Sequence, residues 1–150
     1  MTFRIPPLIQ YLLCAILAWA VSQFLPSFTF NHIFLQASGG ILVLCGIILL
    51  SSAVMAFMKH KTSVNPVNLD QTQYLVTKGF YRYSRNPMYL GFLLLLIGQA
   101  ALLTNLTALI APAIFYAVMT TIQIKPEEKA LTLKFGEAYI AYCRRTRRWL

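Results

Sequence analysis

The sequence predicts an all-α integral membrane protein with about four transmembrane helices and a C-terminal amphipathic helix on the cytoplasmic side. The 150-residue chain is 58% hydrophobic and only 11% charged, a composition that water-soluble domains rarely have. Four stretches also lack Asp, Glu, Lys and Arg, and each is close to the ~17–25 residues that cross a bilayer. These stretches are residues 8–25, 36–58, 88–103 and 106–124.

The first two stretches form an N-terminal two-helix region, residues 1–58. The opening stretch is preceded by a single basic residue, Arg4, and no small-residue cleavage site stands near Pro26. We therefore expect a retained helix and not a cleaved signal peptide. The connection that follows, residues 59–87, is polar and contains turn-forming residues such as Pro66 and Gly79. Loops of this length are usually functional.

The last two apolar stretches are separated only by Thr104 and Asn105. This short break predicts a tight hairpin of two transmembrane helices, and a single re-entrant hairpin over residues 88–124 is the alternative. All of residues 1–150 are expected to form one membrane domain.

The segment after the fourth stretch predicts a new helix that begins at Pro126. Proline is tolerated in a first helical turn, and the acidic pair Glu127 and Glu128 suits the positive end of the helix dipole. Leu131, Phe135 and Tyr139 then recur at helical spacing, and arginines close the segment. This pattern is typical of an amphipathic helix at the membrane interface.

The net charge of +9 is distributed asymmetrically along the chain. Apart from Arg4, every Lys and Arg lies in residues 59–85 or 125–148, and the loops over residues 27–35 and 104–107 have none. By the positive-inside rule, both termini and the middle connection are predicted to be cytoplasmic. The short length of the chain favours a bacterial inner membrane. The charge is explained by topology and contact with anionic headgroups, and no nucleic-acid recognition module accompanies it. The three cysteines show no metal-site spacing.

Two polar clusters flank the predicted hairpin. Because the hairpin leaves one membrane face and returns to it, we expect both clusters to lie on the same face. The cluster after the hairpin is Glu127 and Glu128. The cluster before it comprises Tyr81, Arg82, Tyr83, Arg85, Asn86 and Tyr89.

Together these clusters indicate a pocket for a ligand with several chemical groups. Carboxylates can take an ammonium or hydroxyl groups, an arginine or asparagine can take a carboxylate, and a tyrosine ring can face a sulfonium. The residues alone leave a second interpretation open. In that interpretation Arg82 and Arg85 are interfacial anchors, the tyrosines form an aromatic belt, and the glutamates only begin a helix.

The sequence LVTKGFYRYSRNPMYLG (residues 75–91), with PEEKALTLKFGEAYIAYCRRTRRW (residues 126–149), resembles the isoprenylcysteine carboxyl methyltransferase and phospholipid methyltransferase superfamily of integral membrane enzymes. The resemblance covers the C-terminal half, residues 75–150. In that superfamily an Arg-His-Pro-x-Tyr-x-Gly-like signature and a downstream Glu-Glu pair bind S-adenosylmethionine near the cytoplasmic surface. The resemblance implies S-adenosylmethionine-dependent methyl transfer to a lipophilic acceptor, such as an isoprenylcysteine-like carboxylate or another lipid-like molecule.

The resemblance implies a set of site residues. Arg82 and Arg85 are the expected catalytic residues, because a guanidinium can orient a carboxylate acceptor. Asn86 stands where many members have histidine, and its amide can bind a ligand but has no titratable proton. An amine or phenol acceptor would need a base, and His60 is the only histidine expected on the cytoplasmic side. The expected cofactor-binding residues are Gly79, Tyr81, Asn86, Pro87, Tyr89, Gly91, Glu127 and Glu128.

Two other classes of function remain as alternatives. The superfamily is loosely similar to membrane reductases of sterol-like substrates that use NADPH. A non-enzymatic membrane scaffold is the other alternative, and transport ranks lower because no charged residue lies inside the four apolar stretches. Under all of these interpretations membrane lipids surround the chain.

Overall fold

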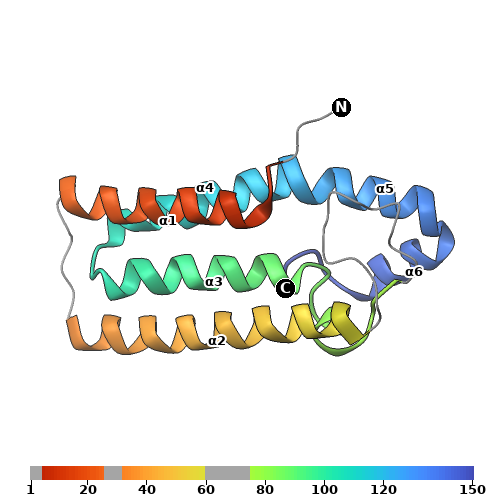
Figure 1. The fold of residues 1–150 in the computed structure, drawn as a ribbon, viewed down its shortest axis with the longest axis horizontal. Helices are drawn as coiled ribbons and strands as arrows, with labels where there is room; N and C mark the ends of the chain where they lie inside the picture. The colour runs from red at the N-terminus through yellow and green to blue at the C-terminus, as the bar shows by residue number, and fades with distance from the viewer. Residues whose placement is uncertain (1–4, 26–31, 60–74) are drawn as a thin grey trace.

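The computed structural model describes residues 5–25, 32–59 and 75–150, and these residues form helices and no β-strand. Four antiparallel helices lie side by side, with α2 along one edge, α3 in the middle, and α1 and α4 along the other edge (Figure 1). His60 and most of the polar connection 59–87 lie outside the described residues. The four helices are α1 (Pro7–Phe24), α2 (His32–Lys59), α3 (Pro87–Leu102) and α4 (Ile110–Val118).

Three helical stretches are long and apolar enough to cross a membrane, namely Pro7–Phe24, His32–Ala56 and Leu106–Phe135. They confirm the prediction of an all-helical integral membrane protein. α3 has 16 residues and is a shorter apolar helix. At 1.5 Å per residue it is ~24 Å long, less than the ~30 Å hydrocarbon core of a bilayer. A fourth span at α3 therefore stays a prediction.

Glycines allow α2 and α3 to approach each other closely. A Cβ atom added to Gly46 would lie 2.9 Å from the main-chain oxygen of Gly91, and one added to Gly98 would lie 2.9 Å from that of Gly39. Small residues at such crossings are common where membrane helices pack through van der Waals contact. The two glycine pairs therefore hold α3 close to α2 over about the middle half of α3.

The turn between α3 and α4 is held to the end of α1 by a buried amide. Asn105 caps the short helix η3 (Leu106–Leu109), because its Oδ1 accepts a hydrogen bond of 2.9 Å from the main-chain N–H of Thr107. The Nδ2 group of Asn105 donates to the main-chain oxygens of Ser22 and Leu25, each at 3.3 Å. The chain reverses at Thr104 and Asn105, where the sequence analysis placed the break.

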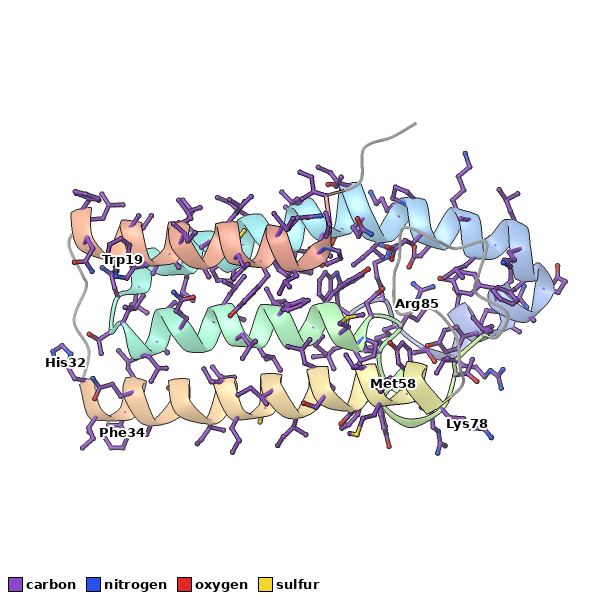
Figure 2. All side chains as sticks on the ribbon, viewed as in Figure 1. Trp19, His32, Phe34, Met58, Lys78 and Arg85 are labelled. Atoms are coloured by element: carbon purple, nitrogen blue, oxygen red, sulfur yellow. The ribbon has the colours of Figure 1, made fainter. Side chains whose placement is uncertain are left out.

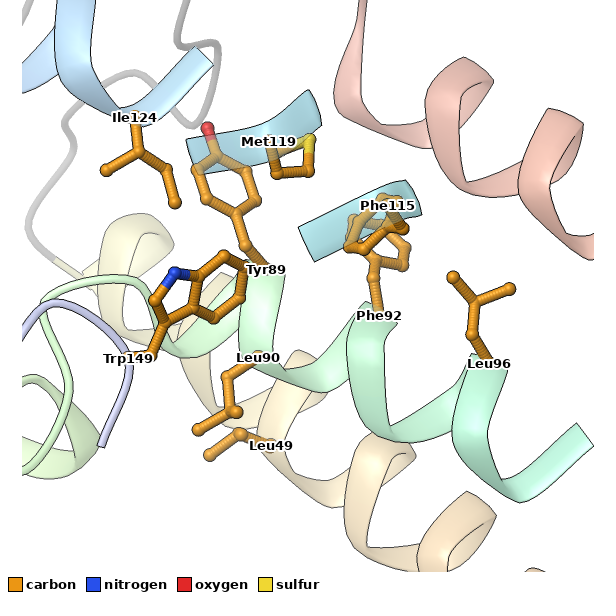
Figure 3. Close-up of a cluster of buried hydrophobic side chains, with 9 residues drawn as sticks. All are labelled: Leu49, Tyr89, Leu90, Phe92, Leu96, Phe115, Met119, Ile124 and Trp149. Carbon is orange, nitrogen blue, oxygen red and sulfur yellow. The ribbon is translucent and has the colours of Figure 1, made fainter. Parts of the chain in front are cut away.

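The main hydrophobic core joins α2, α3, the α4 region and the C-terminal end of the chain (Figure 3). Its aromatic centre is Phe92, whose ring stacks on Tyr11 with centroids 4.9 Å apart and meets Phe115 edge-on at 6.4 Å. Trp149 lies in the same core, beside Tyr89 and Leu90. The end of the chain is thus packed against the membrane helices.

The helix that contains α4 does not end before Pro126, which differs from the prediction. It continues from α4 through a π-helical segment, η4 (Met119–Ile124), into α5 (Lys125–Phe135). The reason is chemical. Pro126 has no N–H to donate and its ring would crowd the carbonyl of Ile122 in a regular α-helix. The wider π-helical turn, in which the N–H of Lys125 donates to the oxygen of Thr120, relieves this conflict.

The predicted C-terminal amphipathic helix is two helices, α5 and α6 (Glu137–Arg145). They are separated by Gly136, whose φ of 52° and ψ of −129° favour glycine. The break turns α6 back toward the start of α3 (Figure 1). It also divides the predicted apolar stripe, since Leu131 and Phe135 lie on α5 whereas the buried Tyr139 lies on α6.

Candidate functional site

The two predicted polar clusters meet at one end of the helical bundle. The hydroxyl group of Tyr89 lies 3.0 Å and 3.1 Å from the two carboxylate oxygens of Glu127. Nη2 of Arg85 lies 3.1 Å from Oε1 of Glu128. Figure 2 shows Arg85 between the start of α3 and the α5–α6 segment. These contacts confirm that the two sequence-distant clusters lie together.

Glu127 lies in the first turn of α5 and is only 8% exposed. It accepts hydrogen bonds from Tyr89 and from Nε2 of Gln123, a residue with 0% exposure. Because an ionised carboxylate only accepts, the NH₂ group of Gln123 must face Glu127 and Oε1 must face away. This Oε1 atom is buried, and within the described part of the chain it has no hydrogen-bond partner.

Arg85 contributes a second unpaired atom to the site. Its Nη groups contact Glu128 and Sγ of Cys143, but the buried Nε–H has no partner among residues 5–25, 32–59 and 75–150. Buried polar groups in native proteins are nearly always hydrogen-bonded, so each exception needs an explanation. The unpaired acceptor is Oε1 of Gln123 and the unpaired donor is Nε–H of Arg85. A ligand bound in this polar cluster could form hydrogen bonds with both.

Glu128 binds two arginines. Arg148 contacts it through two hydrogen bonds, from Nε to Oε1 at 3.0 Å and from Nη2 to Oε2 at 2.7 Å, and Arg85 shares Oε1. Charge-assisted bonds in this fork geometry are among the stronger polar contacts in proteins. The hydrogen bond to Glu128 also raises the pKa of the Arg148 guanidinium. Glu128 thus joins α5 to the end of the chain.

We call residues Thr146–Trp149 the C-terminal strap. The strap crosses the start of α3, where the N–H of Arg85 donates to the oxygen of Arg147 at 2.9 Å and Nδ2 of Asn86 donates to that of Arg148 at 3.0 Å. Nε1 of Trp149 donates to the hydroxyl of Thr120 at 3.1 Å. The strap therefore contacts the predicted site along its whole length.

Asn86 and Pro87 begin α3, as proline at a first helical position favours. The main-chain N–H of Asn86 donates to Oγ of Ser84 at 3.1 Å, and the side-chain amide reaches the strap. Pro87 is fully buried. These contacts place both residues beside Arg85 and Glu128, and their predicted role in cofactor binding stays a prediction.

Of the other predicted residues before α3, Tyr81 is buried near Glu127, whereas Gly79 and Arg82 lie at the surface. Tyr81 is 6% exposed, and its main-chain oxygen accepts a 2.6 Å hydrogen bond from the hydroxyl of Tyr142. Burial, followed by the neighbouring Tyr142, raises the pKa of the Tyr81 phenol. Gly79, with a φ of +64°, and Arg82 lie at the surface in the short helix η2 (Gly79–Arg82), where they line a hollow. Among the described residues the ion pairs of Glu128 are made by Arg85 and Arg148, not by Arg82.

Gly91 contacts α2 and not the polar cluster. A Cβ atom at this position would lie 2.9 Å from Cγ of Leu50 and 3.1 Å from the oxygen of Gly46. The structure thus gives Gly91 a packing function that the sequence analysis missed. Its cofactor-binding role stays a prediction.

Three further residues of the site escaped the sequence analysis. Gln123 had a detectable signal, because it is an amide in an apolar run and precedes Glu127 by four residues, so both lie on one helix face. Arg148 had no such signal, since it is one of several arginines in the same basic run. Trp149 had no such signal either. Their positions depend on the turn at Gly136, which sends α6 back to the site.

Comparison with known proteins agrees with this geometry. The family model described as phospholipid methyltransferase matches residues 34–138, which is more than half of the chain. Protein-S-isoprenylcysteine O-methyltransferase A of Arabidopsis thaliana is 30% identical over 112 residues, covering 75% of this chain and 57% of the plant protein. The enzyme of Schizosaccharomyces pombe is 30% identical over 119 residues, with 78% and 50% covered.

The mouse protein-S-isoprenylcysteine O-methyltransferase is 27% identical over 146 residues, covering 91% of this chain and 50% of the mouse protein. The chain thus spans about half the length of the curated relatives that it matches. No solved structure matches it significantly. The family match spans α2, α3, α4 and α5, including both polar clusters, and the chain therefore belongs to the phospholipid methyltransferase family.

Proposed function

We propose that the chain is an S-adenosylmethionine-dependent integral membrane methyltransferase that acts on a lipophilic acceptor at the cytoplasmic membrane face. The observation that carries this proposal is the joining of Tyr89 to Glu127 and of Arg85 to Glu128 at one end of an apolar bundle. The names of the relatives support it, since several are isoprenylcysteine O-methyltransferases. They give no support to the NADPH reductase or scaffold alternatives.

The residues present fit this cofactor chemically. S-adenosylmethionine carries an ammonium, a carboxylate and ribose hydroxyls, and when bound it supplies a methyl group activated on a sulfonium. Glu127 and Glu128 offer acceptors for the cation and the hydroxyls. Arg85, with its unpaired Nε–H, and Asn86 offer donors for the carboxylate. Tyr89 and the fully buried Gln123 fix the orientation of Glu127.

The remaining predicted residues have proposed supporting roles. Gly79 and Tyr81 shape the chain before the site, and Pro87 and Gly91 fix α3 where it meets the site and α2. Arg85 orients a carboxylate acceptor, and Arg82 is the second predicted orienting residue, at the surface end. An acceptor that is already an anion needs alignment and no base. This fits Asn86, which has no proton to transfer at neutral pH.

We propose that α1, α2, α3 and the helix over residues 106–135 all cross the membrane and that both termini are cytoplasmic, as expected in a bacterial inner membrane. The polar site would then open to the cytosol, from which a charged cofactor comes. An isoprenylcysteine-like or other lipid-like acceptor would enter laterally from the bilayer. The amphipathic segment α5–α6 would lie at the interface between them.

The test is methyl transfer by purified protein in detergent micelles. We would incubate it with methyl-tritiated S-adenosylmethionine and either N-acetyl-S-farnesylcysteine or N-acetylcysteine as the acceptor. The expected product is a base-labile methyl ester on the farnesylated acceptor alone. Glu127→Gln should lose most of the activity, whereas Glu137→Gln, at an exposed position on α6, should retain it.

Calorimetry with S-adenosylhomocysteine separates binding from acceptor choice. Measurable binding without ester formation would mean that the acceptor is different and would leave the cofactor proposal intact. Absence of binding at millimolar ligand would overturn the proposal. Normal binding by the Glu127→Gln and Glu128→Gln double variant would show that the site is elsewhere.

A further inference from the structure

The C-terminal strap is hydrogen-bonded to residues that the cofactor is proposed to use. Arg148 holds both carboxylate oxygens of Glu128, and its main-chain oxygen holds the amide of Asn86. The main-chain oxygen of Arg147 holds the N–H of Arg85. Three of the residues proposed to bind the ligand are therefore bound to the protein's own C-terminal segment.

The contact of Arg148 with Glu128 has the chemistry of a bound cationic ligand. A guanidinium donates two parallel N–H bonds to the carboxylate, and Arg85 takes one oxygen of the same group. A carboxylate with three N–H donors has little capacity left for an ammonium or a hydroxyl group. A ligand that uses Glu128 therefore competes with Arg148 for the carboxylate oxygens.

The strap is attached unevenly, which makes this displacement feasible. The Arg148 side chain is 36% exposed, and Leu150 after it is 71% exposed. An ion pair at this exposure contributes less than a buried one because water and salt screen it. Trp149, in contrast, is 9% exposed and anchors the strap in the core. The guanidinium can leave Glu128 while the indole stays in place.

We infer that Arg148 is an internal competitor for the cofactor. Its guanidinium is hydrogen-bonded to the carboxylate of Glu128 in the free protein and is released when S-adenosylmethionine binds. This inference rests on the proposed function. The affinity of the free protein for the cofactor is then lower than the site alone would give, because part of the binding free energy is used to release Arg148. Removing the guanidinium should therefore tighten binding.

The experiment compares three proteins in detergent by calorimetry with S-adenosylhomocysteine: wild type, Arg148→Gln and Arg145→Gln. The control removes the same charge from an exposed position at the end of α6. We expect Arg148→Gln to bind about tenfold more tightly than wild type, as expected for release of one charge-assisted contact that is partly screened. Arg145→Gln should bind like wild type, and Arg148→Lys should be intermediate because a lysine has no fork of donors.

Each result has a defined meaning. Equal affinity in Arg148→Gln and Arg145→Gln, or weaker binding by Arg148→Gln, would overturn the inference and make Arg148 neutral or part of the ligand site. Absence of binding in every variant would overturn the proposed cofactor as well. The fluorescence of Trp149, measured after Trp19→Phe, would show whether the anchor stays buried: an unchanged emission maximum in Arg148→Gln excludes loss of the fold as the cause of an altered affinity.

Discussion

The hydrogen bond between Tyr89 and Glu127 allows a quantitative test of the site. Tyr89→Phe removes the hydroxyl group and keeps the ring, so the packing around Phe92 and Leu90 stays filled. The lost bond joins a donor residue that is 4% exposed to a carboxylate residue that is 8% exposed. Hydrogen bonds to charged groups contribute about 1.5–3 kcal/mol. We therefore expect Tyr89→Phe to lower the free energy of unfolding by about 2 kcal/mol.

The assay is a double-mutant cycle measured by unfolding in mixed detergent micelles. Glu127→Gln makes the acceptor neutral, so in that background Tyr89→Phe should cost only about 1 kcal/mol, the usual value for a neutral pair. Tyr83→Phe is the matched control, because Tyr83 is 70% exposed and its substitution should change stability by less than about 0.5 kcal/mol.

Two results would refute the reasoning. A cost for Tyr89→Phe no larger than that of Tyr83→Phe would mean that the hydroxyl makes no useful bond. An equal cost of Tyr89→Phe with and without Glu127→Gln would mean that the charge of Glu127 does not strengthen its hydrogen bond with Tyr89. Either result would remove one of the two contacts between the polar clusters on which the proposed function depends, and would leave only that of Arg85 with Glu128.

Three further predictions concern stability. Gly46→Ala should lower the free energy of unfolding by about 1–3 kcal/mol, because its Cβ would lie 2.9 Å from a main-chain oxygen of α3. Gly40→Ala, with nothing within 4 Å of its Cβ, should be neutral or stabilising. Thermal unfolding in detergent would show the difference. Asn86→Ala should speed proteolysis of the C-terminal strap, measured by mass spectrometry, since the tether to the strap's main chain is lost. Burial raises the pKa values of Tyr81 and Tyr142, so the folded protein holds these protons more tightly than the unfolded chain. Stability should be unaffected below about pH 10 and should fall as the pH rises above it, and Tyr142→Phe should weaken this fall in an alkaline unfolding titration.

The helices were predictable because their signal is local. Uninterrupted apolar stretches end where a charge, a proline or an asparagine stands, and α1 and α3 begin and end within one residue of the predicted stretches. The meeting of the two polar clusters was predictable for a different reason. A chain that leaves and re-enters the same face brings both ends together whatever the side chains are, so topology alone was sufficient.

The C-terminal segment was not predictable from the same signals. Its apolar spacing fits one helix, whereas α6 is held in place by a hydrogen bond from the hydroxyl of Tyr142 to the main-chain oxygen of Tyr81, residues 61 positions apart. Arg148 illustrates the same difficulty. It is one arginine of several in a basic run, and only the return of α6 selects it for Glu128. Non-local contacts of this kind leave no periodic pattern in the sequence.

The π-helical segment η4 links the membrane helices to the polar site. Its wider turn allows the helix to pass Pro126 without a break, so Glu127 stays on a continuous rigid helix. Gln123, inside the segment, contacts Glu127, and Thr120, at its start, contacts Trp149 of the strap. The same helical turn therefore fixes the carboxylate, anchors the strap and leaves the buried Oε1 of Gln123 unpaired. An unpaired buried oxygen costs about 1–3 kcal/mol, a cost that a purely structural helix has no reason to keep. We therefore interpret η4 as part of the candidate site and not as a packing irregularity.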